Sequence, residues 1–518
     1  MTDTTSADTL KGATWATWLG FSTMCVGMFM AILDVQVVAT SLPTIQNALN
    51  IDPDHMSWIQ TSYLMAEVIA IPLTGVLTRL LGMRWLFVLA ISVFTAASIG
   101  CAYSSNFPAL IAWRVIQGFS GGTLIPAVFS AVFLLFPVRQ QGVATTLGGV
   151  LAVLAPTLGP VVGGWITQTY SWQWLFLINV VPGLAAAVLA TVLLPKVLVR
   201  IEEASKLDLV SLMLLAIALA CLVLALKEAP QRGWLSGLII GLFLLSLLSA
   251  AGFILRTLKS PHPVVDIGNF EDRSFALGCI LSFALGIGLF GSVYLMPVFL
   301  AFVRDHNALE IGSIMLVTGV VQLLIAPIAV ALEQRADARL LTAVGFALFA
   351  LGLGLSAIQT PQTDYDGMFW PQVIRGLAIM FCLLPPTRLA LGQLDAARVP
   401  DASGVFNLMR NLGGAIGLAL IDTVIFSRAP VHSVALLDRL QAGDTATAKW
   451  IGVSPELFAA RQPGVLDMSF NAMLQPLIEK ASLTQAINEA WALIAILTAV
   501  ALVCVPFVKV SSASVSAK

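Results

Sequence analysis

The sequence has 518 residues, of which 58% are hydrophobic and only 11% are charged, and its formal net charge is −1. Soluble globular proteins carry about 25% charged residues, so the composition indicates a polytopic membrane protein. A net charge of −1 spread over short loops excludes an electrostatic surface for nucleic acid. The six cysteines lie in apolar runs without metal-ligand spacing, which predicts reduced packing residues and no metal site.

Apolar runs long enough to cross a bilayer recur along the whole chain. A spanning helix needs about 20 apolar residues. Backbone groups in lipid must be hydrogen-bonded within the segment, so these runs predict an all-α membrane protein. The fourteen predicted spans are residues 18–42, 58–78, 85–103, 108–134, 142–166, 175–195, 209–227, 235–256, 275–299, 311–332, 340–358, 369–392, 403–427 and 489–508.

A faint internal repeat divides these spans into two halves. GVLTRLLGMR (75–84) has a degraded echo in ALEQRADAR (331–339), and VIQG (115–118) recurs as VIRG (373–376). Two six-helix bundles with two additional central spans fit this spacing, and repeated halves are typical of transporters. The predicted parts are a cytoplasmic N-terminus at 1–17, a bundle at 18–195, two inserted spans with a linker at 196–256, a bundle at 257–509 that includes an outer loop at 428–488, and a cytoplasmic tail at 510–518.

The distribution of Lys and Arg predicts the orientation in the membrane. With the N-terminus in the cytoplasm, most basic residues lie on inner loops, and the short outer loops hold only Lys227, Arg232 and Arg304. We therefore expect a multi-pass protein with both termini in the cytoplasm.

Three ionisable residues of the first half fall at a similar depth inside predicted spans. At 1.5 Å per helical residue, Asp34, Glu67 and Arg114 lie about 12, 14 and 9 Å below the outer face. A carboxylate near the middle of a span costs about 2.5–3.5 kcal/mol on insertion scales, which favours a functional role. The pattern predicts a buried acid–base cluster in which one carboxyl group exchanges its proton. The alternative is a static ion pair that fixes helix packing, and Glu67 could instead face the lipid headgroups.

The second half carries a comparable pair of charges. Asp422 and Arg375 fall about 7 and 9 Å below the outer face. They could pair with each other, Asp422 could attract a cationic substrate, or Asp422 could snorkel at a helix end.

The fifth span contains LAPTLGPVVGGWI (154–166), which is rich in glycine and proline. Gly159 and Gly163 are four residues apart and form a small face that lets another helix approach closely. Pro160 removes a backbone hydrogen bond and permits a bend. Ordinary helix packing explains the glycines but not the prolines beside them.

Several ordered motifs resemble those of a known family. GPVVGG (159–164) matches in full the GPxxGG signature of major facilitator superfamily antiporters. LDVQVVATSLPTIQ (33–46) resembles the span-one signature of the fourteen-span drug:proton antiporters, and WRVIQG (113–118) matches their span-four signature. WQWLFLINVVPG (172–183) is similar to the segment that leads into span six. The chain thus resembles EmrB/QacA-type exporters over nearly its whole length, closest to the EmrB branch.

The resemblance implies the major facilitator fold and antiport, with Asp34 on the family's acidic position and Arg114 on its basic one. The antiporter motif of span five falls on Pro156, Gly159, Pro160, Gly163 and Gly164.

One departure from the family pattern concerns the loop after span two. The superfamily usually has an acid at the position of Thr78, whereas this chain keeps only Gly75, Arg79, Gly82 and Arg84 of that motif. A gate that depends on that acid is therefore not expected, although Arg79 and Arg84 could still hold the inner gate or merely set topology.

The outer loop at 428–488 contains apolar positions in helix-length pieces, such as residues 470–487. This pattern favours a docking element or a cap, with an unstructured loop as the alternative. The EmrB branch works with a periplasmic adaptor protein and an outer-membrane channel, so the resemblance implies such partners.

The sequence therefore predicts a proton-coupled exporter of amphipathic compounds that works by alternating access. No cofactor is expected, because the chain lacks a GxxxxGK[ST] loop for ATP and an ion gradient would supply the energy. Phe29, Met30, Met65 and Arg375 are candidate residues of the substrate cavity. The alternatives are a proton-coupled importer or an exporter of one metabolite on the same fold, and a membrane enzyme or sensor whose charges are structural.

Overall fold

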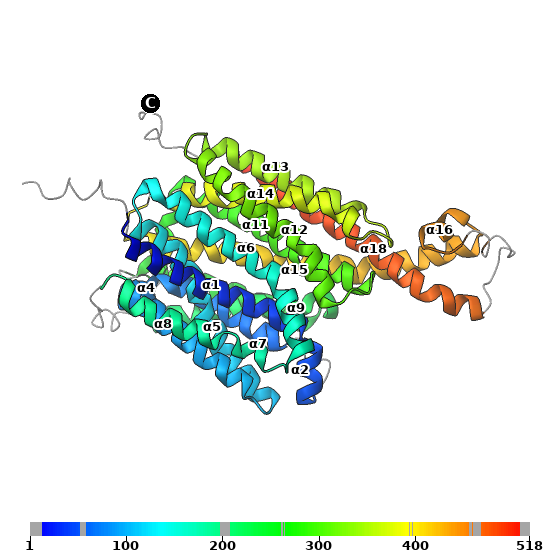
Figure 1. The fold of residues 1–518 in the computed structure, drawn as a ribbon, viewed down its shortest axis with the longest axis horizontal. Helices are drawn as coiled ribbons and strands as arrows, with labels where there is room; N and C mark the ends of the chain where they lie inside the picture. Colours follow the sequence, from blue (N-terminus) through cyan, green and yellow to red (C-terminus); the bar gives the residue numbers. More distant parts are fainter. Residues whose placement is uncertain are drawn as a thin grey trace, which may run out of the picture.

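The structure is a computed structural model that describes residues 13–51, 58–196, 208–260, 263, 265–392, 394–395, 397–454, 458 and 468–507. Helices make up nearly all of these residues, and none of the described residues forms a strand. The helices from α1 to α8 lie beside those from α11 to α18, and α15 and α18 extend beyond the rest (Figure 1). The predicted all-α fold is confirmed.

The helices of the first half are α1 (Trp15–Thr40), α2 (Leu42–Leu49), α4 (Trp58–Ala102), α5 (Phe107–Leu135), α6 (Val138–Thr169), α7 (Trp174–Leu177) and α8 (Val180–Leu193). The two inserted helices are α9 (Leu209–Arg232) and α10 (Gly237–Lys259). The helices of the second half are η3 (Ile267–Glu271), α11 (Arg273–Phe302), α12 (Ala308–Glu333), α13 (Ala338–Leu355), η4 (Ser356–Ile358), α14 (Tyr365–Leu391), α15 (Val399–Gln441), α16 (Thr445–Trp450), α18 (Met468–Val500) and η5 (Ala501–Phe507).

Within the described part of the chain, twelve helices are long and apolar enough to cross a membrane, and the bent helix α6 makes a thirteenth. Helix α4 has 45 residues and breaks at Gly82, whose φ of 73° is in the left-handed region that favours glycine. Ile59 and Ser98, from its two ends, both hydrogen-bond to side chains of α5. The chain therefore folds back at Gly82, and α4 supplies two spans. This arrangement is consistent with the fourteen predicted spans.

The bend in α6 lies where the sequence places its prolines. Segments Val138–Pro156 and Leu158–Thr169 meet at 44°. Pro160 has no N–H group to bond to the carbonyl of Pro156, four residues earlier, and its ring crowds that carbonyl. The bend therefore falls in the turn that precedes Pro160.

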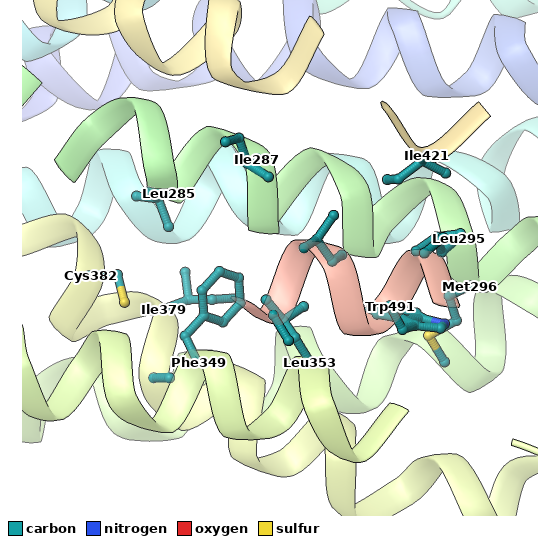
Figure 2. Packing of buried hydrophobic residues seen from close by; sticks show 14 of the residues in the cluster. Leu285, Ile287, Leu295, Met296, Phe349, Leu353, Ile379, Cys382, Ile421 and Trp491 are labelled. Atoms are coloured by element: carbon teal, nitrogen blue, oxygen red, sulfur yellow. The ribbon is translucent and has the colours of Figure 1, made fainter. Parts of the chain in front are cut away.

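Each half has its own apolar core, and a further cluster, which includes Leu215 and Phe253, joins the inserted helices to both halves. In the second half, α11, α13, α14 and α18 surround a cluster that includes Phe349, Ile379 and Trp491 (Figure 2). Helices α9 and α10 are joined by a hydrogen bond from Ser246 Oγ to the Ala218 carbonyl, 2.8 Å long. Only a minority of their residues are buried, as expected for helices that face lipid.

The predicted outer loop is mostly helical where the structure describes it. Helix α15 continues past residue 427, the predicted end of its span, and α18 begins at Met468. With α16 they form an extension beyond the other helices (Figure 1), packed around a small core that includes Leu440, Ile451 and Leu474. The helix-length apolar pieces noted in the sequence at 428–488 thus lie in helices, which does not decide between a docking element and a cap. Their apolar positions stabilise helices through this core.

Candidate functional site

The carboxylate of Asp34 lies at the centre of a polar network in the first half. Asp34 is 2% exposed and accepts hydrogen bonds from Arg114 Nη1 at 2.5 Å, Gln117 Nε2 at 3.0 Å and Asn179 Nδ2 at 2.8 Å. Arg114 and Gln117 come from α5, and Asn179 directly precedes α8. Three donors from two elements thus hold one carboxylate of α1 out of contact with solvent.

Arg114 is fixed by groups other than Asp34. Its Nε donates to the Ile59 carbonyl at 3.1 Å, and its Nη1 also donates to Gln117 Oε1 at 2.8 Å. The guanidinium carbon lies 4.4 Å from the centre of the Tyr63 ring, at cation–π distance. Tyr63 in turn donates its hydroxyl to the Ala31 carbonyl at 3.1 Å. The guanidinium would therefore keep its position if Asp34 lost its charge.

The local sequence explains why these groups meet. Helix α1 is apolar on all sides, so it packs in the interior and its single carboxylate is buried with it. Arg114 and Gln117 are three residues apart on α5 and therefore point from the same face. Ser98 Oγ accepts a second bond from Gln117 Nε2 at 2.9 Å and fixes the orientation of that amide.

Glu67 is also buried, but it does not bond to Asp34's network in the described part of the chain. Its carboxylate interacts electrostatically with Arg114 in its own half and with Arg410 of α15 in the other half. Arg410 lies 5.4 Å over the Phe129 ring and bonds to Asn407. Glu67 therefore faces the interface between the halves, whereas Asp34 and Arg114 bond to each other within the first half.

Asp422 and Arg375 do not pair. Asp422 accepts a hydrogen bond from Tyr294 Oη at 2.7 Å. Arg375 lies 4.9 Å over the Trp491 ring, and its Nη2 is 3.6 Å from Met296 Sδ. Of the alternatives for these residues, a mutual ion pair is wrong.

The motif after span two contacts the opposite half through a carboxylate that the sequence reading missed. Arg79 forms an ion pair with Asp401 in the first turn of α15. A Cβ atom on Gly75 would collide with the same carboxylate, so only glycine permits this approach. Thr78 Oγ1 donates to the Thr74 carbonyl of its own helix at 2.6 Å. An acid is therefore present at this contact, but the other half of the chain supplies it.

The remaining motif residues have packing roles. Arg84 lies 5.7 Å over the Trp85 ring. A Cβ atom on Gly159 would meet Gln36 of α1, two residues after Asp34. The carbonyls of Gly163 and Gly164 accept hydrogen bonds from Thr167 Oγ1 at 2.7 and 3.2 Å.

The three apolar residues predicted to line a substrate cavity pack in the first half. Met30 is buried in one core cluster of the first half, and Phe29 packs against another. Met65 is half-buried on α4. None of them lies among the residues around the cavity beside Arg375 or around the one beside His432.

Sequence reasoning missed Gln117, Asn179, Tyr63, Asp401 and Arg410. Gln117 had a local signal, because it lies one turn after Arg114 on the same helix face. Asp401 lies 322 residues from Arg79, so its partner is decided only by how the halves pack.

The fold and the site define a membrane transporter built from two helical halves. A family model described as Major Facilitator Superfamily matches residues 24–418. The chain therefore belongs to the Major Facilitator Superfamily and is a secondary transporter, not an enzyme.

Similar proteins agree with this assignment. The chain is 38% identical over 421 residues to the colistin resistance protein EmrB of Acinetobacter baumannii, covering 80% of this chain and 81% of that one. It is 30% identical over 417 residues to the multidrug export protein EmrB of Escherichia coli K12, covering 80% and 81%. Its fold resembles that of the human organic anion transporter MFSD10 with a TM-score of 0.59 and 14% identity, covering 93% and 99%.

Proposed function

We propose that this protein exports amphipathic compounds in exchange for protons, with Asp34 as the proton-exchanging group. One observation carries the proposal: a carboxylate of a membrane-spanning helix is held, away from solvent, by a guanidinium and two amides. Inserting an ionisable residue into a membrane costs free energy, so such residues usually belong to an ion pathway. Relatives whose names include multidrug export and colistin resistance support export of varied compounds.

The network supports a change of state on protonation. A buried ion pair depends on close geometry and on hydrogen bonds to both partners. Protonation of Asp34 removes its attraction to Arg114, while Ile59 and Tyr63 keep the guanidinium in place. The ion pair that ties α1 to α5 would then be lost, which lowers the cost of a shift between the two helices.

A continuous set of contacts connects α1 to the opposite half. Gln36 packs against Gly159 of α6, and Val161 of α6 packs closely against Gly312 of α12. Because glycine leaves no side chain between these helices, a shift of α1 displaces α6 and thereby α12. We infer that this path couples proton binding to the opening of the halves.

The contact between Arg79 and Asp401 supports the assignment of an inner gate. Nearby, Ser403 Oγ of α15 donates to the Pro126 carbonyl of α5 at 3.1 Å, which also joins the halves. We propose that these contacts close the side predicted to be cytoplasmic and break when that side opens. This assignment follows the predicted orientation, with both termini in the cytoplasm and the protein in the inner membrane.

We further propose that the extension formed by α15, α16 and α18 docks a periplasmic adaptor protein that leads to an outer-membrane channel. Its own apolar core supports a rigid element. Replacing the residues between α15 and α18 by a short glycine linker should abolish resistance in cells while uptake into everted vesicles persists. Unchanged resistance would contradict the docking role.

Transport in everted vesicles tests the function itself. A lipophilic cationic dye and a lipophilic acid are offered with an acidic lumen, and uptake should collapse when an uncoupler is added. Uptake that ignores the uncoupler would contradict proton coupling. Uncoupler-sensitive accumulation in intact cells, instead of in vesicles, would identify an importer, and transport of one compound only would identify a specific metabolite exporter.

A further inference from the structure

We propose that Arg375 and Gln372 form a subsite for the anionic group of a substrate, inside a small cavity of the C-terminal half. The inference rests on the proposed export function, because it names a chemical class among the exported compounds. The cavity lies between α11, α12 and α14.

Arg375 is a buried cation without a carboxylate partner in the described part of the chain. It is 4% exposed, and its Nε has no hydrogen-bond partner. Its contacts are the Trp491 ring at 4.9 Å and the sulfur of Met296 at 3.6 Å. Met296 and Trp491 lie beside each other at one end of the apolar cluster in Figure 2. A thioether is a weak acceptor, and a ring face compensates a buried charge only in part.

Gln372 supplies a second unused donor in the same cavity. It is fully buried, and its Oε1 accepts from Thr318 Oγ1 at 3.2 Å, whereas its Nε2 has no partner. Gln372 and Arg375 are three residues apart on α14, so they share one helix face. Buried donors without acceptors are rare and call for a missing partner. An oxyanion would accept hydrogen bonds from both groups.

The internal repeat shows what this pair of residue types does in the other half. Matching VIQG (115–118) to VIRG (373–376) aligns Gln117 with Arg375 and Arg114 with Gln372. The first half therefore has Arg then Gln, and the second has Gln then Arg. In the first half the pair holds the carboxylate of Asp34. In the second half the arginine contacts the sulfur of Met296 instead of a carboxylate. We infer that the ligand supplies the carboxylate.

The walls of the cavity indicate the rest of the ligand. Leu289, Val293, Met315 and Ile379 line it with apolar groups, and methionine adapts to varied shapes. The cavity has a free volume of about 20 Å³, which holds about one water molecule, so the lining side chains must move apart to admit a carboxylate. We therefore expect the subsite to bind the head group, with the rest of the ligand outside this small cavity. The expected ligands are amphipathic compounds with one carboxylate or similar oxyanion.

A matched set of probes tests the subsite on the full-length protein in lipid nanodiscs. The probes are 11-(dansylamino)undecanoate, its methyl ester, and the analogue with a trimethylammonium group in place of the carboxylate. The wild type should bind the acid about 10- to 100-fold more tightly than the ester. Arg375→Gln should remove this preference and leave ester binding unchanged. Equal binding of acid and ester by the wild type would overturn the proposal.

Control variants separate the subsite from general electrostatics. Arg428 is an exposed arginine that pairs with Glu489, and Arg428→Gln should leave the preference for the acid unchanged. A loss equal to that of Arg375→Gln would overturn the proposal. If Arg375→Gln fails to fold, Gln372→Leu takes its place. This variant should lower the affinity for the acid about fivefold and leave the affinity for the ester unchanged. Equal weakening of both probes by Gln372→Leu would also overturn it.

Nanodisc binding needs no proton gradient, so the two proposals can fail separately. A wild type that takes up the cationic dye in an uncoupler-sensitive way, but shows no preference for the acid, overturns the subsite alone. A preference for the acid without proton-driven transport supports the subsite and contradicts the exporter.

Discussion

The polar centres of the two halves contain similar residues in different electrostatic states. In the first half, the arginine of α5 meets a carboxylate of α1, and the hydrogen bonds of that carboxylate come from three side chains. In the second half, the arginine of α14 meets a sulfur atom and a ring face. The available carboxylate, Asp422, is bonded instead to Tyr294 at 2.7 Å.

This difference indicates that the two halves bind different ions or ligands. A centre with its own buried counterion can gain and lose a proton without a ligand. A centre with a buried cation and no counterion is stabilised when a ligand supplies the anion. We infer that the first half responds to protons and the second to substrate.

The largest expected effect comes from neutralising the two carboxylates separately. Asp34→Asn should insert normally but abolish proton-driven uptake in everted vesicles, because an amide cannot exchange a proton. Asp422→Asn should lower uptake about fivefold at most, because an amide oxygen still accepts the bond from Tyr294. Glu271→Gln changes an exposed acid and serves as the control. Full transport by Asp34→Asn would remove Asp34 from the coupling role.

The next effect concerns the two arginines and the stability of the protein. Arg114→Met leaves Asp34 buried without its counterion and should lower the free energy of unfolding by about 3–5 kcal/mol. Arg375→Met removes an unpaired buried charge and should be neutral or stabilising. Both are measured by denaturant unfolding of the purified protein without substrate. Equal destabilisation by the two variants would show that the centres do not differ in this way.

The double variant Asp34→Asn with Arg114→Met provides the control for the first half. It removes both charges and should recover part of the stability lost in Arg114→Met alone, because no unpaired carboxylate remains.

The smallest effect compares the glutamines of the two centres. Gln117 donates to Asp34 and to Ser98, so Gln117→Leu should cost about 1–3 kcal/mol of unfolding free energy. Gln372 uses only its oxygen, so Gln372→Leu should cost about 1 kcal/mol or less without ligand. The same unfolding assay measures both. A larger loss for Gln372→Leu would reveal a partner for its amide group in the free protein and weaken the proposed subsite.

The comparison also shows how far depth along a helix can predict contacts. Depth placed Asp34 and Arg114 at one level, and they bond directly. The same reasoning placed Asp422 and Arg375 at one level, and they do not pair. Depth follows from 1.5 Å per residue, but the direction of a side chain around the helix axis depends on how each helix is rotated against its neighbours. The same rise places Glu67 near the level of Asp34, but the side chain of Glu67 faces the other half.

The sequence by itself determined the membrane class, the helical spans and the buried position of Asp34. These follow from local rules, because lipid requires apolar side chains and hydrogen-bonded backbone over about 20 residues. Only the tertiary structure decided which groups surround Asp34, which carboxylate meets Arg79, and that Arg375 meets none in the described chain. Those pairings join residues far apart in sequence, such as Asp34 with Asn179 and Arg79 with Asp401. They depend on helix rotation and on contact between the halves, for which no local pattern exists.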